Sequence, residues 1–181
     1  ETDSVSMDNI SAEYKMTEYL IELGHKKIAY VGSINATTSI MDRYLGYRRA
    51  LHHYNILYRE DYLIEDRGED RLFKELALPE DMPTAFVCNN DEIACILIEK
   101  LEKMGYSVPE DISVTGFDNY PFIRRNASGL TTVDVDIAMM ASEGVELLLE
   151  RLNDKRETFV RRVVSVHIVI RKSTGKAATE P

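Results

Sequence analysis

Residues 84–119 have the sequence TAFVCNNDEIACILIEKLEKMGYSVPEDISVTGFDN, and this stretch is the clearest guide to the fold. Its apolar opening, 84–88, predicts a buried strand that ends in a polar turn. The next segment, 91–104, has apolar residues at helical spacing and is followed by Gly105, a typical helix stop. A second apolar segment, 112–117, predicts another strand. A strand, a helix and a strand in this order are typical of a parallel sheet.

The same alternation extends over most of the chain. Further helices are expected at 11–23, 39–53, 70–78 and 136–152, and further strands at 26–32, 62–64, 130–133 and 161–171. Ser39 is predicted to cap the second helix, because Asp42 resembles the acidic residue of a capping box. The pattern predicts an α/β fold with three layers, α/β/α, around a mainly parallel sheet. Residues 176–181 are polar, and a disordered tail is expected there.

Composition limits the classes of function. The chain has 181 residues, of which 44% are hydrophobic, and a formal charge of −9. This is enough apolar material for one good core, and the negative charge disfavours non-specific binding to nucleic acid. Cys88 and Cys95 are expected to be core residues. No apolar run approaches the ~20 residues of a membrane span and no secretory signal is visible, so we expect a cytoplasmic protein.

Polar side chains follow three of the predicted strands. Parallel sheets bind ligands at the carboxyl ends of their strands, beside helix N-termini. The candidates at these ends are Ser33, Asn35, Thr37, Thr38, Ser39 and Arg43, then Asn89, Asn90 and Asp91, and finally Asp118 and Asn119. Together they could read a polyol, because hydroxyl groups need both donors and acceptors in fixed geometry.

Each of these residues also has a plainer interpretation. Asn, Asp and Ser are common at helix N-termini, and Asp91 fits such a capping role. Arg43, taken alone, is compatible with a surface position on a helix. The residues by themselves leave both interpretations open.

The common enzymatic signatures are missing from the sequence. It contains no GxSxG, GxxxxGK[ST], GxGxxG or HExxH motif. None of the histidines follows a strand end beside a candidate nucleophile; they are His25, His52, His53 and His167. We therefore expect a binding protein rather than an enzyme, with no catalytic residue, no metal and no cofactor.

Several segments resemble, in order, the effector domain of the lactose/galactose repressor (LacI/GalR) family. They are DNISAEYKMTEYLIELGHKKIAYVGS (8–33), DRYLGYRRAL (42–51), TAFVCNNDEIA (84–94), MGYSVPEDISVTGFDN (104–119), LTTVDVD (130–136) and HIVIRKST (167–174). The resemblance covers nearly the whole chain. It implies a periplasmic-binding-protein-like (type I) fold and a transcriptional regulator. Its small polar effector, for which a sugar is expected, would lie in a cleft between two subdomains.

The resemblance also implies particular site residues. Family effector contacts map onto Arg43, Asn90 and Asp118, and more loosely onto Ser39. The segment EDRGED (65–70) matches the family pattern poorly, so no contact is carried over there.

Part of the family pattern has no counterpart in this chain. The DNA-binding headpiece and most of the first subdomain are absent, and the chain begins with Glu1, as in a processed or cut fragment. Residues 1–175 are then the C-terminal portion of the effector domain, namely the second subdomain plus the helix 136–152. In the family this helix packs on the first subdomain. Its stripe of Ile137, Val145 and Leu148 would need another cover, either the folded-back fragment or a second copy.

The implied partners follow from the family. They are a small-molecule effector, a second copy in a homodimer, and operator DNA only through the missing headpiece, with no membrane. With half of the clamp absent, weak or undetectable sugar binding is expected. Two alternatives stay open: a periplasmic-type sugar-binding protein of a transporter, which shares the fold, and an α/β enzyme.

Overall fold

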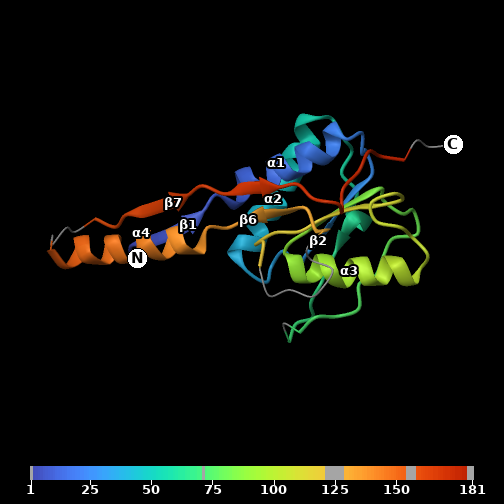
Figure 1. The fold of residues 1–181 in the computed structure, drawn as a ribbon. Coiled ribbons are helices and arrows are strands. Elements are labelled where there is room, and N and C mark those ends of the chain that lie inside the picture. The colour runs from blue at the N-terminus through green and yellow to red at the C-terminus, as the bar shows by residue number, and fades with distance from the viewer. Residues whose placement is uncertain (1, 71, 121–128, 154–157, 179–181) are drawn as a thin grey trace.

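The structure is a computed structural model that describes residues 2–70, 72–120, 129–153 and 158–178. Its elements are β1 (Ser4–Met7), α1 (Asn9–Glu22), β2 (Ile28–Val31), α2 (Thr38–His53), η1 (Glu60–Tyr62), β3 (Leu63–Ile64), β4 (Ala85–Cys88), α3 (Asp91–Lys103), β5 (Ser113–Thr115), β6 (Thr132–Asp134), α4 (Ile137–Asn153), β7 (Arg161–Val164) and β8 (His167–Val169). Figure 1 shows a rounded body and an arm that extends from it, made of β1, α4 and β7.

The body is built around a parallel sheet with the strand order β3-β2-β4-β5. Every residue of β2 and β4 is buried, which explains why both strands are continuous apolar runs. Successive residues of a strand point to opposite faces of the sheet, so the side chains of β2 and β4 contribute to two hydrophobic cores. One core joins the sheet to α3 through Ala29, Val31, Phe86, Cys88, Val114, Ile93, Leu97 and Leu101. The other joins it to α1 and α2 through Ile28, Tyr30, Ala85, Val87, Leu20, Tyr44, Tyr47 and Leu51. The three-layer prediction is confirmed, and Cys88 and Cys95 are buried free thiols as expected.

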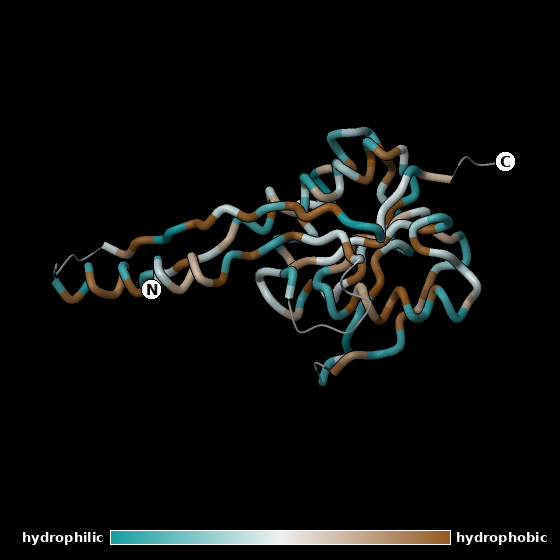
Figure 2. Tube along the Cα trace, in the orientation of Figure 1, coloured by the Kyte–Doolittle hydropathy of each residue, from teal (hydrophilic) through white to brown (hydrophobic). Residues whose placement is uncertain are grey.

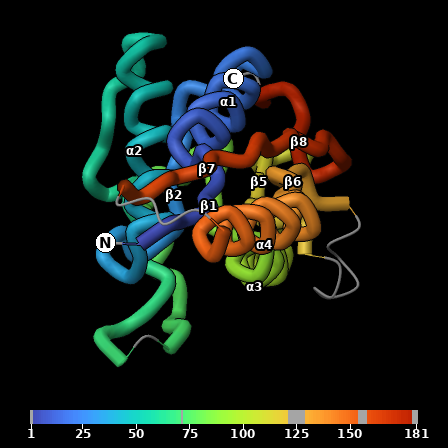
Figure 3. The backbone as a smooth tube through the Cα atoms, turned by 90° about the vertical axis from the view of Figure 1, so that its left-hand side faces the viewer, coloured from blue at the N-terminus to red at the C-terminus, as the bar shows by residue number. Residues whose placement is uncertain are grey.

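The arm is a small unit with a large apolar surface. β1 pairs with β7 in parallel, from Ser4 opposite Arg161 onward, and α4 packs against this pair (Figure 3). Leu147 is the only described residue of α4 that is buried. The predicted stripe of Ile137, Val145 and Leu148 exposes more than half of each side chain (58%, 58% and 59%), and Figure 2 shows apolar residues along this helix. No segment of the described part of the chain covers the stripe.

Two predicted elements are wrong. The predicted helix 70–78 is absent from its described residues, 70 and 72–78: Lys74 N–H donates to Asp66 O, Gly68 N–H donates to Leu72 O, and Arg67 pairs with Phe73 in an antiparallel bridge. These contacts between residues 66–68 and residues 72–74 replace the hydrogen bonds of a helix. Leu76, which follows them, is buried in the core. The expected strand 161–171 is two strands, because β7 pairs with β1 in the arm whereas β8 pairs antiparallel with β6 at the body.

The start of α2 and the C-terminal segment also call for comparison with the sequence prediction. The N-cap of α2 is Thr37, whose hydroxyl accepts a hydrogen bond from Ile40 N–H (3.2 Å), and Ser39 lies within the first turn of the helix. Within the segment predicted to be a disordered tail, Ala177 N–H donates to Leu23 O (3.0 Å). Residues 179–181 lie outside the described part. Among the described helices, none combines the length and apolar character that a membrane crossing needs.

Candidate functional site

Arg43 is the centre of the candidate site. It lies on α2 with 6% of its surface exposed, so the plainer interpretation as a surface arginine is wrong. Its Nε donates to Asn9 Oδ1 (3.0 Å), its Nη1 to the backbone oxygen of Asn89, and its Nη2 to Asp118 Oδ1 (3.2 Å). The guanidinium carbon lies 3.6 Å from the ring centroid of Phe117, a cation–π contact. A guanidinium held in this way through three of its five N–H groups is a pre-organised donor.

Asp118 brings a carboxylate to the same point. It follows β5 with φ of +104°, a left-handed conformation that turns the chain at the strand end. Burial raises its pKa, while the Arg43 charge and hydrogen bond oppose that rise. Its side chain is still 39% exposed, against 8% for that of Arg43. The structure therefore pairs two of the predicted site residues and leaves one of them, Asp118, partly exposed.

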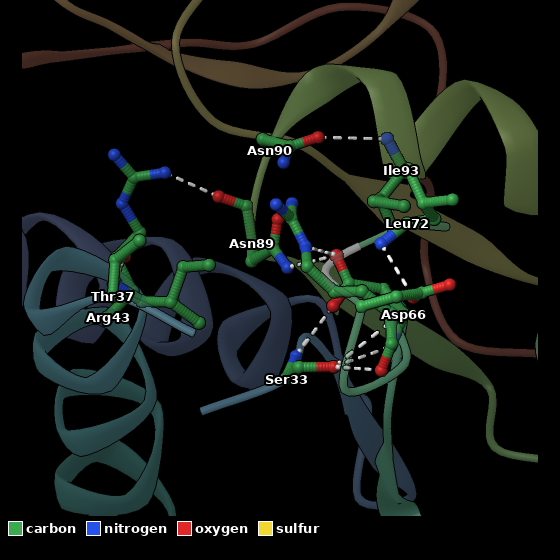
Figure 4. Close-up of polar contacts among 11 residues, drawn as sticks. Ser33, Thr37, Arg43, Asp66, Leu72, Asn89, Asn90 and Ile93 are labelled. Carbon is green, nitrogen blue, oxygen red and sulfur yellow. Dashed lines mark hydrogen bonds and ion pairs between the residues drawn. The ribbon is translucent and has the colours of Figure 1, made fainter. Parts of the chain in front are cut away.

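Asn90 and Ser39 are placed differently. Asn90 is the N-cap of α3, and its Oδ1 accepts a hydrogen bond from Ile93 N–H (2.9 Å). Figure 4 shows this oxygen directed towards Ile93, with the amide nitrogen on its other side. The plainer capping interpretation therefore holds for Asn90, and its amide donors make no bond with another described residue. The Ser39 hydroxyl makes no hydrogen bond with another described residue, so the structure does not join this side chain to the Arg43–Asp118 pair.

Asp91 has a structural role. It begins α3, is buried, and accepts hydrogen bonds from Tyr120 N–H (3.0 Å) and Thr132 Oγ1. Burial raises its pKa to about 6, although these hydrogen bonds act in the opposite direction. The carboxylate therefore connects the loop after β5 to β6.

Three residues that contribute to the site were not selected from the sequence, namely Asn9, Glu13 and Asp66. Asn9 and the backbone of Asn89 hold Arg43, Asp66 holds the side chain of Asn89, and Glu13 lies fully buried near Arg43. Only Asp66 carried a visible signal, since it lies in a run of acidic residues directly after a predicted strand. The roles of Asn9 and Glu13 could not be predicted from the sequence, because they depend on the packing of α1 against α2.

A pocket of about 400 Å³ opens at the strand-end edge. Its lining residues are Ser33, Ile34, Asn35, Ala36, Glu65, Arg67, Gly68, Glu69 and Lys74, so it lies beside the Arg43–Asp118 pair without including it. This size is within the range of small-molecule sites. Among the described residues, no group of three or more His, Cys, Asp or Glu is arranged to hold a metal ion.

Comparison with known proteins identifies the family. Residues 17–174 match the family described as periplasmic binding protein-like domain. The repressor PurR of Mannheimia succiniciproducens is 34% identical over 185 residues, covering 98% of this chain and 54% of that protein. The arabinose metabolism transcriptional repressor of Geobacillus stearothermophilus is 30% identical over 179 residues, covering 94% and 49%. The chain thus spans about half the length of these curated relatives, which are repressors and not enzymes.

Solved structures agree with this. A putative LacI regulator from Bacillus cereus subsp. cytotoxis superposes with a TM-score of 0.84 at 26% identity, over 98% of this chain and 64% of that one. A CelR–cellobiose complex gives 0.82 at 26%, over 95% and 54%. A LacI family regulator from Enterococcus faecium with bound ribose gives 0.78 at 27%, over 97% and 67%. The chain belongs to the periplasmic binding protein-like family and is an effector-binding domain of the kind found in LacI-type transcriptional regulators.

Proposed function

We propose that this domain binds a small polyhydroxylated effector, a sugar, at the edge where Arg43 and Asp118 meet. The observation that carries the proposal is the pairing itself: a buried guanidinium, held through three of its five N–H groups, beside a carboxylate that is still partly exposed. Such a pair offers a donor and an acceptor in fixed geometry, which is what neighbouring hydroxyl groups require. The bound cellobiose and ribose of two similar regulators support this class of ligand.

Asn90 and Ser39 complete the proposed contacts less directly. The amide nitrogen of Asn90 makes no bond with another described residue, so it can donate to a ligand while its oxygen caps α3. Ser39 lies in the first turn of α2, one turn before Arg43 on the same helix.

We further propose that residues 1–175 comprise one complete subdomain and a part of another. The body would be the complete subdomain, and the arm would join the missing part through the exposed stripe of α4. Each such side chain gains roughly 1.5–3 kcal/mol on burial, so this surface favours a partner. The edge that holds Asp118 then forms one wall of a cleft, and weak sugar binding is expected from this chain alone.

In the whole regulator, effector binding would shift the balance between open and closed arrangements of the two subdomains. A homodimer would convert this shift into altered operator binding through a headpiece outside this chain, in the cytoplasm. The repressor relatives favour this interpretation over a sugar-binding protein of a transporter.

The test is a thermal-shift screen of pentoses, hexoses, disaccharides and purines on the complete regulator, repeated with Arg43→Ala and Asp118→Asn. A sugar should raise the melting temperature of the wild type, and neither variant should respond. Arg49→Ala, which removes an arginine outside the site from the same helix, is the matched control and should respond normally. A sugar response that survives both site variants would refute the proposed site, and a response to purines alone would refute the ligand class.

A further inference from the structure

Asp66 is a fully buried carboxylate that ties three loops together. It accepts hydrogen bonds from Ser33 N–H (2.7 Å), Asn89 Nδ2 (2.9 Å) and Arg67 Nε (3.1 Å). Ser33 and Asn89 follow the neighbouring strands β2 and β4, while Asp66 follows β3. The Ser33 hydroxyl in turn accepts hydrogen bonds from the backbone N–H groups of Asp66 and Arg67. Figure 4 shows Asp66 between Ser33 and Asn89.

Asn89 connects the hydrogen bonds of Asp66 to the candidate site. Its side chain donates to Asp66, its backbone N–H donates to Val31 O, and its backbone oxygen accepts the Nη1 of Arg43. The residue is fully buried, and a Cβ added at Gly32 would lie only 2.7 Å from its Nδ2. Close packing, the backbone bond to Val31 and the side-chain bond to Asp66 therefore hold Asn89 and set the direction of its backbone oxygen.

We propose that Asp66 is a positioning residue of the effector site, which holds Asn89 so that the Asn89 carbonyl can hold the guanidinium of Arg43. Asp66 has no direct bond to Arg43 and acts only through this relay. The inference rests on the proposed function for its biological meaning, but the relay itself can be tested without any effector.

The charge state of Asp66 supports the relay. Burial alone would raise its pKa, yet the hydrogen bonds from Asn89 and Ser33 and the Arg67 charge hold the pKa below its ordinary value. The group is therefore a carboxylate, an acceptor only, in which both oxygens receive donors. An amide at this position would turn an N–H group towards at least one of those donors.

The direct test is hydrogen exchange of the Arg43 Nε–H, followed by ¹⁵N NMR of the 181-residue chain and assigned with Arg43→Lys. This proton is donated to Asn9 in a buried site and should exchange slowly. Asp66→Asn should accelerate its exchange by about tenfold or more, relative to the backbone amide of Leu97 in the opposite core. A merely structural defect would accelerate both protons equally. Asp61→Asn, the same change at an exposed carboxylate, is the control and should alter neither.

A donor–acceptor swap sharpens the test. In Asn89→Asp, two carboxylates face each other, so the Arg43 proton should again exchange faster. In the double variant Asp66→Asn/Asn89→Asp, the new amide at position 66 can donate to the new carboxylate at position 89, and at least part of the protection should return. If Asp66→Asn fails to fold, Asn89→Ala removes the same bond and should give the same acceleration.

The relay is overturned if a folded Asp66→Asn chain keeps the wild-type ratio of the two exchange rates. It is also overturned if the double variant is no better protected than the worse single one. Failure of the sugar screen would refute the proposed function but leave these rates unchanged, so the two failures are distinguishable.

Discussion

The Glu13 carboxylate lies fully buried within reach of the Arg43 charge, yet neither of its oxygens has a hydrogen-bond partner among the described residues. Burial raises its pKa to about 8, the Asp118 charge acts in the same direction, and Arg43 acts against both. Glu13 is therefore neutral at pH 7. The Arg43 guanidinium therefore has two carboxyl groups near it, that of Asp118, which accepts its hydrogen bond, and that of Glu13, which does not.

Glu13 makes the stability of the chain depend on pH. The folded pKa of about 8 exceeds the ordinary value of 4.5, so the folded state holds a proton that the unfolded state loses. Stability is then fully retained below pH 4.5 and falls as the pH rises through about 8, by roughly 1.4 kcal/mol per unit of pKa difference at most. Urea unfolding between about pH 5.5 and 8.5 should show a smaller fall for Glu13→Gln than for the wild type. The control change Glu22→Gln should leave the slope unaltered, and equal slopes for all three chains would contradict a protonated Glu13.

Arg43→Ala should destabilise the fold as well as abolish binding. It removes three hydrogen bonds and leaves Asn9 and the Asn89 carbonyl without their donor in a buried site. The loss should be about 1–3 kcal/mol in urea unfolding, because Asp118 can still be solvated. Arg43→Lys should lose less, since it keeps the charge but not the fork of donors. Arg49→Ala should stay within about 0.5 kcal/mol of the wild type, and a similar loss for Arg49→Ala would show that the effect is not specific to the site.

The true N-cap of α2 can be distinguished from the predicted one by two alanine changes. Thr37→Ala removes the hydroxyl that accepts from Ile40 N–H and should cost about 1 kcal/mol. Ser39→Ala should be close to neutral, because Ser39 makes no such bond. Thermal unfolding of both variants under one condition decides the matter, and the reverse order would restore Ser39 as the cap.

The segment after β8 should contribute to stability. The buried Ser173 hydroxyl donates to Val114 O (2.6 Å) and accepts from Thr131 N–H (2.8 Å). Ser173→Ala leaves both partners unsatisfied and should cost about 1–3 kcal/mol in urea unfolding. Ser165→Ala, outside this hydrogen-bonded segment, is the control, and near-neutral values for both variants would mean that the segment is not anchored in solution.

The exposed stripe of α4 should make the chain self-associate when no other cover is present. Leu148→Lys places a charge in the stripe and should lower the fraction of dimer at a given concentration in sedimentation velocity. Leu57→Lys changes a leucine that is 86% exposed but lies outside the arm, so it should have no effect. A wild-type chain that stays monomeric at high concentration would contradict the prediction.

Short-range patterns predicted most of the body correctly. The run of four buried residues in β4 and the apolar spacing of α3 are local features, and both elements lie close to their expected bounds. The errors have a common cause. The spacing of apolar residues predicts a helix at 70–78. The structure instead pairs this segment with residues 66–68 of the same chain, through Lys74 N–H to Asp66 O and the bridge between Arg67 and Phe73. One strand was expected at 161–171, but its two halves pair in different sheets.

In the candidate site too, local sequence predicts one part and contacts between distant segments decide the rest. The sequence by itself determined that Arg43 and Asp118 stand near strand ends, because a parallel sheet brings those ends to one edge. Only the tertiary structure decided that Arg43 is buried, that Asn9 and the Asn89 carbonyl hold it, and that Glu13 lies near it without a partner among the described residues. These relations join side chains that are far apart in the chain, such as Asn9 and Arg43, which are 34 positions apart. No local periodicity encodes them, because they depend on how closely α1, α2 and β4 pack around the same point.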